Sequence, residues 1–214
     1  MNVFIFHGTF GYPEENWFPW LKRQMENQGI KTYVPKFPTP KGQSLTSWLK
    51  AFKPYEKYID KETIFVGHSL GPVFILRLLE KRKEPVLASI LVAPFNAILS
   101  VPEFDELNKT FIEKPFNWQK IKQNCKHFVV FRGSDDPYIP ADQPEKMREA
   151  LSKKIITEGK RLANRLNVDF KEIKKGGHFN TKAGYSEFFE VLTEINRLLF
   201  SGKKEKWLLA KQKN

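Results

Sequence analysis

Three short segments of the sequence carry residue types that can act together as a nucleophile, a base and an acid. Residues 67–71 read Gly-His-Ser-Leu-Gly, which places a serine between two glycines. Residues 133–140 read Gly-Ser-Asp-Asp-Pro-Tyr-Ile-Pro, and residues 176–179 read Gly-Gly-His-Phe. A serine hydroxyl is a weak nucleophile at neutral pH, and it needs an imidazole to accept its proton and a carboxylate to orient that imidazole. The three segments therefore predict attack by a serine on a carbonyl carbon.

Ser69 is the candidate nucleophile because an apolar run precedes its segment and an amphipathic run follows it. The order of strand (Thr63–Val66), tight turn and helix (Pro72–Lys81) is typical of a nucleophile elbow, in which a strained backbone holds the serine Oγ above the sheet. Glycines two residues before and after the serine allow the strand and the helix to approach closely. The five-residue pattern alone arises by chance in roughly one chain in 15 of this length. The alternative, an ordinary turn serine, is disfavoured by the two later segments.

The candidate acid and base follow two later strands. The strand His127–Phe131 leads into the segment that holds Asp135 and Asp136, and the strand Val168–Ile173 leads to His178. The order serine, aspartate, histidine along the chain is the one that follows a nucleophile elbow. One aspartate would orient His178 and the other would cap the next helix, and the spacing leaves both assignments open.

The apolar pattern predicts an α/β fold, a three-layer sandwich in which a mostly parallel central sheet lies between two layers of helices. The carboxyl ends of parallel strands meet at one edge of such a sheet, and all three segments fall at such ends. The expected strands are Asn2–Phe6, Lys31–Val34, Thr63–Val66, Val86–Val92, His127–Phe131 and Val168–Ile173. The expected helices are Asn16–Gln28, a helix from Ser44 or Thr46 to Tyr58, Pro72–Lys81 and Tyr185–Leu199.

Two stretches depart from the alternation of strands and helices. Residues 95–123 form an aromatic connection broken by prolines, which we predict to be a short lid over the site. Residues 141–167 are long for one crossover and are predicted to hold two helices with a break near Gly159. We expect residues 1–200 to form one domain and residues 201–214 to form a basic tail.

With these segments in order, the sequence resembles the α/β-hydrolases, and most of all the small serine hydrolases that include retinoblastoma-binding protein nine and its bacterial relatives. The matching pieces are the first strand leading into His7-Gly8 and the three segments described above, which span nearly the whole chain. The resemblance implies that the acid is the residue just before Pro137, which is Asp136, with Asp135 as the alternative.

We expect Ser69 to attack the carbonyl of an ester, thioester or amide, with His178 as the general base and then the general acid. Water would then release the acyl group from the enzyme. The developing oxyanion needs N–H donors, and the backbone N–H of Leu70 is the first candidate because this residue follows the nucleophile. The backbone N–H of Thr9, in the loop after the first strand, is the second candidate, with that of Phe10 as the alternative.

Several aromatic residues flank the predicted loops. Core packing is the default interpretation of each, but as a set they also predict an apolar pocket for the acyl group; these are Phe10, Phe95, Trp118 and Tyr138. We expect His7 to shape the loop after the first strand and His68 to serve packing rather than chemistry.

The composition limits the class of ligand. The net charge is +12, but the lysines and arginines are scattered over predicted helices except in the tail, so we expect no nucleic-acid partner. No histidines or cysteines have the spacing of metal ligands, and no glycine-rich nucleotide loop is present, so we expect neither a metal nor an organic cofactor. Cys125 is the single cysteine. Together with the absence of an export signal or an apolar run of 18 residues, it predicts a cytoplasmic protein without a membrane span.

Two alternatives use the same sequence features. The basic tail and the name of the resembling family allow a catalytically weak scaffold that acts as a protein-binding module, with a protein as its partner. A complete set of nucleophile, base and acid favours an enzyme with a small-molecule acyl substrate instead. Acyl transfer or perhydrolysis would use the same three groups, since it differs only in the acceptor that reaches the acyl-enzyme.

Overall fold

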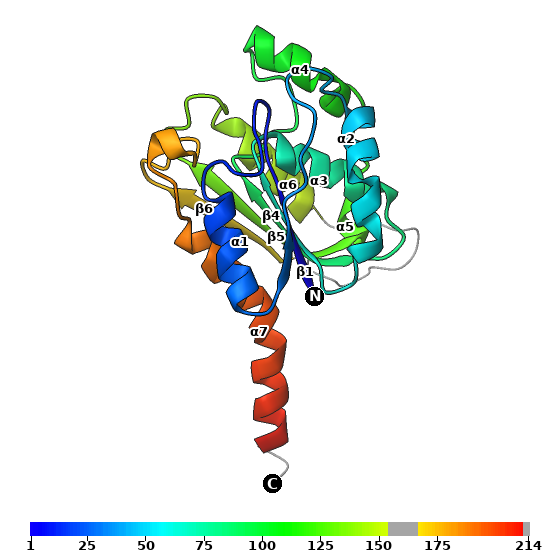
Figure 1. Ribbon diagram of the computed structural model, residues 1–214, viewed down its shortest axis with the longest axis vertical. Helices are drawn as coiled ribbons and strands as arrows, with labels where there is room; N and C mark the ends of the chain where they lie inside the picture. Colours follow the sequence, from blue (N-terminus) through cyan, green and yellow to red (C-terminus); the bar gives the residue numbers. More distant parts are fainter. Residues whose placement is uncertain (154–166, 212–214) are drawn as a thin grey trace.

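The computed structural model describes residues 1–153 and 167–211, and its centre is a sheet of six parallel strands in the order β2-β1-β3-β4-β5-β6 (Figure 1). This arrangement confirms the predicted α/β fold class. The strands are β1 (Asn2–Phe6), β2 (Lys31–Tyr33), β3 (Ile64–His68), β4 (Val86–Val92), β5 (Cys125–Gly133) and β6 (Asn167–Ile173).

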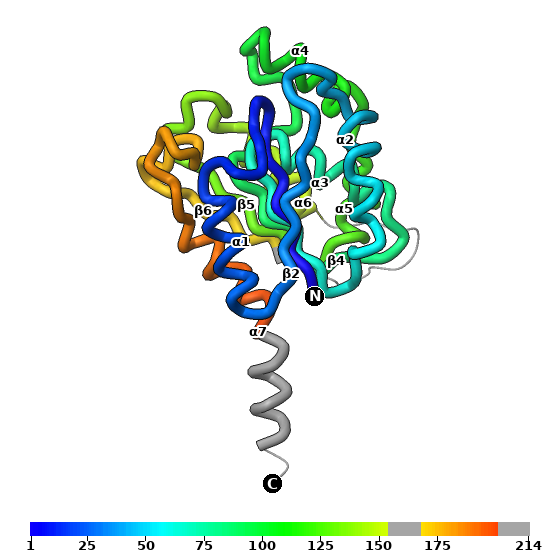
Figure 2. Tube along the Cα trace, viewed as in Figure 1, coloured from blue at the N-terminus to red at the C-terminus, as the bar shows by residue number. Residues whose placement is uncertain are grey.

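Helices cover both faces of the sheet, as the trace in Figure 2 shows. On one face α1 and α7 lie together, and the ring centroids of Trp20 and Phe189 are 4.9 Å apart. On the other face α2 packs on α3 through Trp48 and Phe74, with centroids 5.3 Å apart. The helices are α1 (Phe18–Asn27), α2 (Leu45–Phe52), α3 (Leu70–Lys81), α4 (Pro102–Ile112), α5 (Trp118–Gln123), α6 (Asp142–Ser152) and α7 (Phe189–Lys211), with short 3-10 helices η1 (Lys53–Tyr58) and η2 (Thr181–Ala183).

The central strands are apolar on both sides because helices cover both faces of the sheet. Every residue of β3 is buried, and in β4 only Leu87 is partly exposed. The core continues from the strands into the helices, for instance where the ring of Phe6 contacts those of Phe65 and Phe74 with centroids 5.5 Å and 5.7 Å away. This rigid core holds the carboxyl ends of β1, β3, β4, β5 and β6 in place.

Two helices differ from their expected bounds. The helix that was expected to run to Tyr58 begins with Ser44 as its N-cap and ends as an α-helix at Phe52, followed by η1. Pro54 explains the change, since its ring and missing N–H are incompatible with the interior of an α-helix. The last helix begins at Phe189 rather than Tyr185, and it continues to Lys211 through the region expected to be a tail.

Residues 141–167 were expected to hold two helices. The structure places α6 at Asp142–Ser152. The expected break near Gly159 and the second helix fall in residues 154–166, which lie outside the described residues.

The stretch 95–123 contains two helices with different positions. Helix α4 lies above the carboxyl edge of the sheet, at the top of Figure 1. Helix α5 directly precedes β5 in the chain and packs on the start of that strand, at the opposite end of the sheet. Only α4 therefore occupies the position that we predicted for a lid.

Arg77 of α3 anchors the connection between these two helices. Its Nε donates to the carbonyl oxygen of Phe111 at 2.8 Å, and Nη2 donates to that of Lys114. Nη1 forms an ion pair with Glu80 at 3.0 Å, and the guanidinium lies 3.8 Å from the ring centroid of Phe116. The side chain of Arg77 is 6% exposed, so these contacts are shielded from water. They fix the end of α4 to the core.

Candidate active site

Ser69 occupies a strained turn between β3 and α3. Its φ of 59° and ψ of −107° are unusual for a residue with a side chain. The backbone of the turn is held by a hydrogen bond from Ser69 N to Val92 O at 3.0 Å. A Cβ added to Gly67 would lie 2.6 Å from the backbone of Gly71 and of Pro72. The close approach of strand and helix therefore requires the glycine at position 67.

His178 and Asp136 lie together at the same edge of the sheet. The distance from His178 Nδ1 to Asp136 Oδ2 is 2.8 Å, and the two side chains are 10% and 5% exposed. Asp136 Oδ1 accepts hydrogen bonds from the backbone N–H groups of Tyr138 at 2.9 Å and Ile139 at 3.1 Å. Both carboxylate oxygens thus have fixed roles, and Oδ2 is committed to the histidine.

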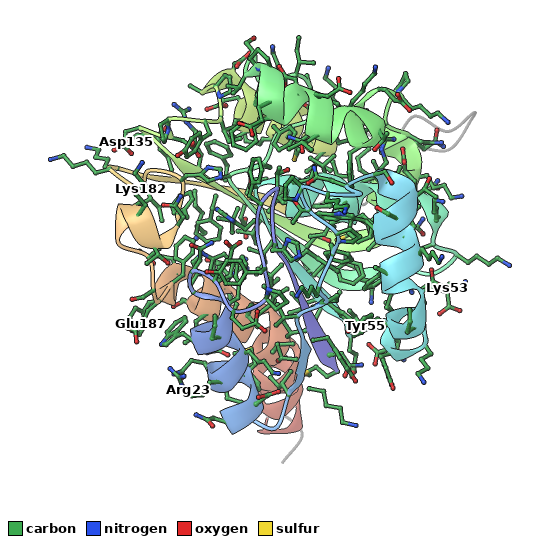
Figure 3. The ribbon with its side chains drawn as sticks, turned by 45° about the horizontal axis from the view of Figure 1, so that its top comes forward. Arg23, Lys53, Tyr55, Asp135, Lys182 and Glu187 are labelled. Atoms are coloured by element: carbon green, nitrogen blue, oxygen red, sulfur yellow. The ribbon has the colours of Figure 1, made fainter. Side chains whose placement is uncertain are left out.

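Asp135 has a different position and different contacts. It is exposed, and its Oδ1 accepts a hydrogen bond from Gly177 N at 2.8 Å. Figure 3 shows Asp135 at the outer edge of the molecule, on the same side as Lys182. The geometry pairs His178 with Asp136, whereas Asp135 supports the backbone of the loop that carries His178.

The loop after β1 packs directly against the nucleophile turn. A Cβ added to Gly8 would lie 2.7 Å from Ser69 Cβ and 3.1 Å from its Oγ. Thr9 follows in this loop and lines the same cavity as Ser69. Leu70 is the first residue of α3, where a backbone N–H has no acceptor within the helix. The two N–H groups predicted to bind an oxyanion are therefore close to the turn, and their role stays a prediction.

His7 shapes this loop as a neutral side chain. Its Nδ1 donates to Gly8 O at 2.8 Å, and its Nε2 accepts from Phe37 N at 3.0 Å. Accepting that bond requires an unprotonated Nε2, and burial lowers the pKa of His7 accordingly. The expectation that His7 has a structural role in the loop is confirmed.

His68 has more than the packing role that we expected. It is 4% exposed, and its Nε2 donates to the backbone oxygen of His178 at 2.6 Å. Burial, reinforced by the neighbouring His178, lowers the pKa of His68 to about 3, so its ring stays neutral at physiological pH. His68 therefore positions the histidine that pairs with Asp136. The two residues are 110 positions apart, and no sequence pattern connects them.

We expect the neutrality of His68 to make the protein less stable in acid. The folded pKa of about 3 lies below 6.5, the value expected in the unfolded chain. Between these values the unfolded state binds a proton that the folded state does not, so the free energy of unfolding falls as pH decreases, by about 1.4 kcal/mol per pH unit for this group. Urea denaturation at pH 7, 6, 5 and 4 measures this slope.

The His68→Gln variant isolates this contribution. Glutamine keeps a side-chain N–H that can reach His178 O, but it does not titrate. Its free energy of unfolding should decline less steeply than that of the wild type below pH 6.5. Identical slopes for the two proteins would show that His68 is not the group responsible.

A cavity of about 320 Å³ opens above Ser69. One wall is aromatic, because Phe104 contacts Phe10 with ring centroids 5.8 Å apart and Tyr138 with centroids 5.9 Å apart. The ring of Tyr138 also lies 5.1 Å from that of His178. The lining residues are Gly8, Thr9, Phe10, Glu15, Asn16, His68, Ser69, Leu99, Phe104, Asn108, Tyr138, Ile139, His178, Asn180 and Lys182.

Two of the four aromatic residues predicted for the pocket do not line it. Phe10 and Tyr138 are part of the lining. Phe95 is instead fully buried in the core. Trp118 begins α5 at the opposite end of the sheet and packs on Phe116, with centroids 5.3 Å apart. The prediction failed for these two because closeness to a loop in sequence does not determine which way a side chain points. Phe104 of α4 takes their place.

Glu15 is a cavity residue that the sequence did not reveal. It lies in the polar loop before α1, where no spacing pattern distinguishes it from its neighbours. Burial raises the pKa of the Glu15 carboxyl to about 7, so both protonation states are populated near neutral pH. The cavity thus contains a carboxyl group that changes its protonation state near neutral pH.

Candidate metal ligands, the single cysteine and apolar helices are the remaining features of the described part of the chain. The side chains that the structure describes, those of residues 1–153 and 168–200, contain no cluster of three or more histidine, cysteine or acidic groups that would hold a metal ion. Cys125 is 1% exposed, and burial raises the pKa of its thiol to about 12, which makes it unreactive. Among the same residues, no helix has the length and apolar character needed to cross a bilayer.

The parallel sheet with a strained serine turn between β3 and α3 defines the chain as an α/β-hydrolase. A family model described as Serine hydrolase matches residues 3–197, and the chain belongs to this family. It is therefore a hydrolase.

Named relatives cover most of the chain. It is 30% identical over 197 residues to "Putative hydrolase YdeN" of Bacillus subtilis (strain 168), which covers 90% of this chain and 94% of the relative. It is 27% identical over 184 residues to "Serine hydrolase RBBP9" of Rattus norvegicus, with 86% of each covered.

Solved structures agree with this assignment. The crystal structure of the ydeN gene product from B. subtilis superposes with a TM-score of 0.77 at 28% identity, covering 91% of this chain and 97% of the other. Est1E from Butyrivibrio proteoclasticus, in a structure with ferulic acid bound, gives a TM-score of 0.63 at 16% identity and covers 100% of this chain and 90% of the other. The similarity to Est1E concerns the fold alone.

Proposed function

We propose that the chain hydrolyses carboxylic esters, thioesters or amides of small molecules through an acyl-enzyme formed on Ser69. The observation that carries this proposal is the 2.8 Å contact between His178 Nδ1 and Asp136 Oδ2 beside a cavity that Ser69 also lines. The strained backbone of Ser69 supports it, since such strain at a cavity is typical of a residue held for function.

The contact with Asp136 determines which nitrogen of His178 carries the proton. A carboxylate only accepts hydrogen bonds, so Nδ1 is the protonated nitrogen and Nε2 is free to accept the proton of Ser69 Oγ. As the serine attacks, His178 becomes positively charged, and the buried carboxylate stabilises this charge. His68 does not oppose it, because its own ring stays neutral.

The rest of the reaction follows from the same groups. His178 donates its new proton to the leaving alcohol, thiol or amine, and the acyl group remains on Ser69. A water molecule that loses a proton to His178 then attacks the acyl carbon, and His178 passes that proton to Ser69 Oγ as the bond to Ser69 breaks and the carboxylic acid leaves. In both steps, the N–H groups of Leu70 and Thr9 would bind the negative oxygen, and losing one such donor typically costs about 10²–10³ in rate.

Labelling by a fluorophosphonate probe tests the nucleophile. We expect the wild type to become covalently labelled on the peptide that contains Ser69, and the Ser69→Ala variant to remain unlabelled, because only an activated serine attacks phosphorus. Ser186→Ala is the matched control, since Ser186 is exposed and lies outside the cavity lining.

Two outcomes would contradict the proposal. Equal labelling of the wild type and Ser69→Ala would show that another residue reacts. No labelling of the wild type, together with no turnover of short p-nitrophenyl esters, would favour a binding module that keeps the hydrolase fold without the chemistry.

A further inference from the structure

Asn108 is a buried polar residue of α4 that lines the cavity and that the proposed reaction does not use. It is 2% exposed. Phe104 precedes it by one helical turn and lines the same cavity, so this face of α4 points inward. A buried amide needs partners for its oxygen and for its NH₂ group, because an unpaired buried polar group is unfavourable.

Neighbouring side chains determine the orientation of the Asn108 amide. Gln43 Nε2 donates to Leu107 O at 3.0 Å, which identifies that atom as the nitrogen because a carbonyl oxygen only accepts. The same Nε2 donates to Asn108 Oδ1 at 3.0 Å, and Thr9 Oγ1 donates to Oδ1 at 2.6 Å. The side-chain oxygen of Asn108 therefore accepts two hydrogen bonds, and its NH₂ group points away from Thr9 and Gln43.

The NH₂ group of Asn108 has no acceptor among the residues whose side chains the structure describes, 1–153 and 168–200. Its Nδ2 appears in none of their hydrogen bonds, although the residue is almost completely buried. Three side-chain atoms in these ranges are completely buried and lack a hydrogen-bond partner, and Nδ2 is not one of them. Nδ2 therefore keeps some contact with accessible space. The remaining direction for its two N–H bonds is the cavity that the residue lines.

We propose that Asn108 Nδ2 forms a subsite that donates a hydrogen bond to an oxygen atom in the acyl chain of the substrate. The preferred substrate is then an ester, thioester or amide whose otherwise apolar acyl group carries an ether, hydroxyl or carbonyl oxygen. This inference rests on the proposed function, because it assumes that an acyl group is bound to Ser69. The aromatic wall formed by Phe10, Phe104 and Tyr138 surrounds the apolar part of the chain.

The position of Asn108 favours a contact with the acyl chain over one with the reacting carbonyl. The N–H groups expected to bind the oxyanion belong to Leu70, the first residue of α3, and to Thr9, in the loop after β1. Asn108 instead belongs to α4, which lies above the carboxyl edge of the sheet (Figure 1), and it lines the cavity together with Phe104. Its hydrogen bond from Thr9 uses the side chain and leaves the backbone N–H of Thr9 free for the oxyanion.

Pairs of p-nitrophenyl esters that differ by one atom test the subsite. In each pair one CH₂ of the acyl chain is replaced by oxygen: butanoate with methoxyacetate, and pentanoate with 3-methoxypropanoate. The ratio of kcat/KM within a pair is divided by the ratio of the hydroxide-catalysed rates, which removes the difference in intrinsic reactivity. We expect the wild type to prefer the oxygen-containing ester about tenfold in at least one pair, because an alkyl chain would leave the buried NH₂ unpaired.

The Asn108→Asp variant removes the donor with little change in shape. An aspartate oxygen still accepts from Thr9 Oγ1 and Gln43 Nε2, but the NH₂ group is gone. We expect the tenfold preference to disappear. Asn117→Asp is the matched control, because Asn117 is the exposed N-cap of α5, a position that aspartate also suits. This variant should keep the preference of the wild type, and thermal unfolding confirms that each protein is folded.

The outcomes distinguish a failure of the proposed hydrolase function from a failure of the Asn108 subsite. If the wild type turns over none of the esters, the proposed function is wrong. If it turns over all of them with corrected ratios near 1, only the subsite is wrong, and this result needs no variant. An equal loss of kcat/KM for both members of a pair in Asn108→Asp would assign the amide to the reacting carbonyl and overturn the subsite.

Discussion

Replacing Asp136 with asparagine is expected to lower kcat about 10⁴-fold while the protein stays folded. The backbone N–H groups of Tyr138 and Ile139 both donate to Oδ1, so the amide oxygen of the new side chain must take that place. The NH₂ group then faces His178 Nδ1, which has to accept a hydrogen bond rather than donate one. The proton of the imidazole moves to Nε2, and this nitrogen can no longer accept the proton of Ser69.

Asp135→Asn is the matched control for this prediction. Asp135 is exposed, and its contact with Gly177 N at 2.8 Å requires only an acceptor, which the asparagine oxygen also supplies. We expect kcat to stay near the wild-type value in steady-state assays with p-nitrophenyl butanoate. A large loss in Asp135→Asn with little change in Asp136→Asn would show that the acid has been assigned to the wrong residue.

The sequence predicted that Ser69, His178 and the pair Asp135 and Asp136 lie at one edge of the sheet, because this placement depends on the topology of the sheet. The choice of Asp136 over Asp135 came from the resemblance to a family. A parallel sheet brings the carboxyl ends of its strands to one edge, so a residue just after a strand is placed by the strand alone. Helices on both faces also make β4 apolar except for Ser89 and make β3 apolar up to His68, which is a strong local signal. Predicting these features does not require knowing which side chains contact one another.

Contacts between distant residues could not be predicted in the same way. The bond from His68 to His178 O joins residues 110 positions apart, and the network at Asn108 joins α4 to two separate loops. A buried polar residue in a helix looks the same in sequence whether its partner is a backbone oxygen, as for Arg77, or a ligand. Only the packed structure shows which donors have acceptors.

The last prediction concerns Gly71, where alanine is expected to destabilise the protein by about 3 kcal/mol. A Cβ at this position would overlap Phe6 O and would lie 3.1 Å from Phe6 C and 3.2 Å from His7 O. These are backbone atoms of β1 and of the loop after it, so they cannot rotate away and α3 has to shift. In a domain of this size we expect the thermal midpoint to fall by roughly 6–12 °C.

Gly29→Ala separates this steric effect from backbone strain. Gly29 has a φ of +74° at the end of α1, and no atom lies within 4 Å of an added Cβ. Gly29→Ala should therefore lower the free energy of unfolding by only about 1 kcal/mol, which is the cost of the left-handed backbone conformation. Its kcat should not change. Gly71→Ala should also lower kcat, because α3 starts at Leu70 directly after Ser69, and its movement away from β1 separates Ser69 from the loop of Gly8 and Thr9. Equal shifts in the thermal midpoint for the two variants, with kcat unchanged in both, would show that the contact between helix and strand does not position the nucleophile.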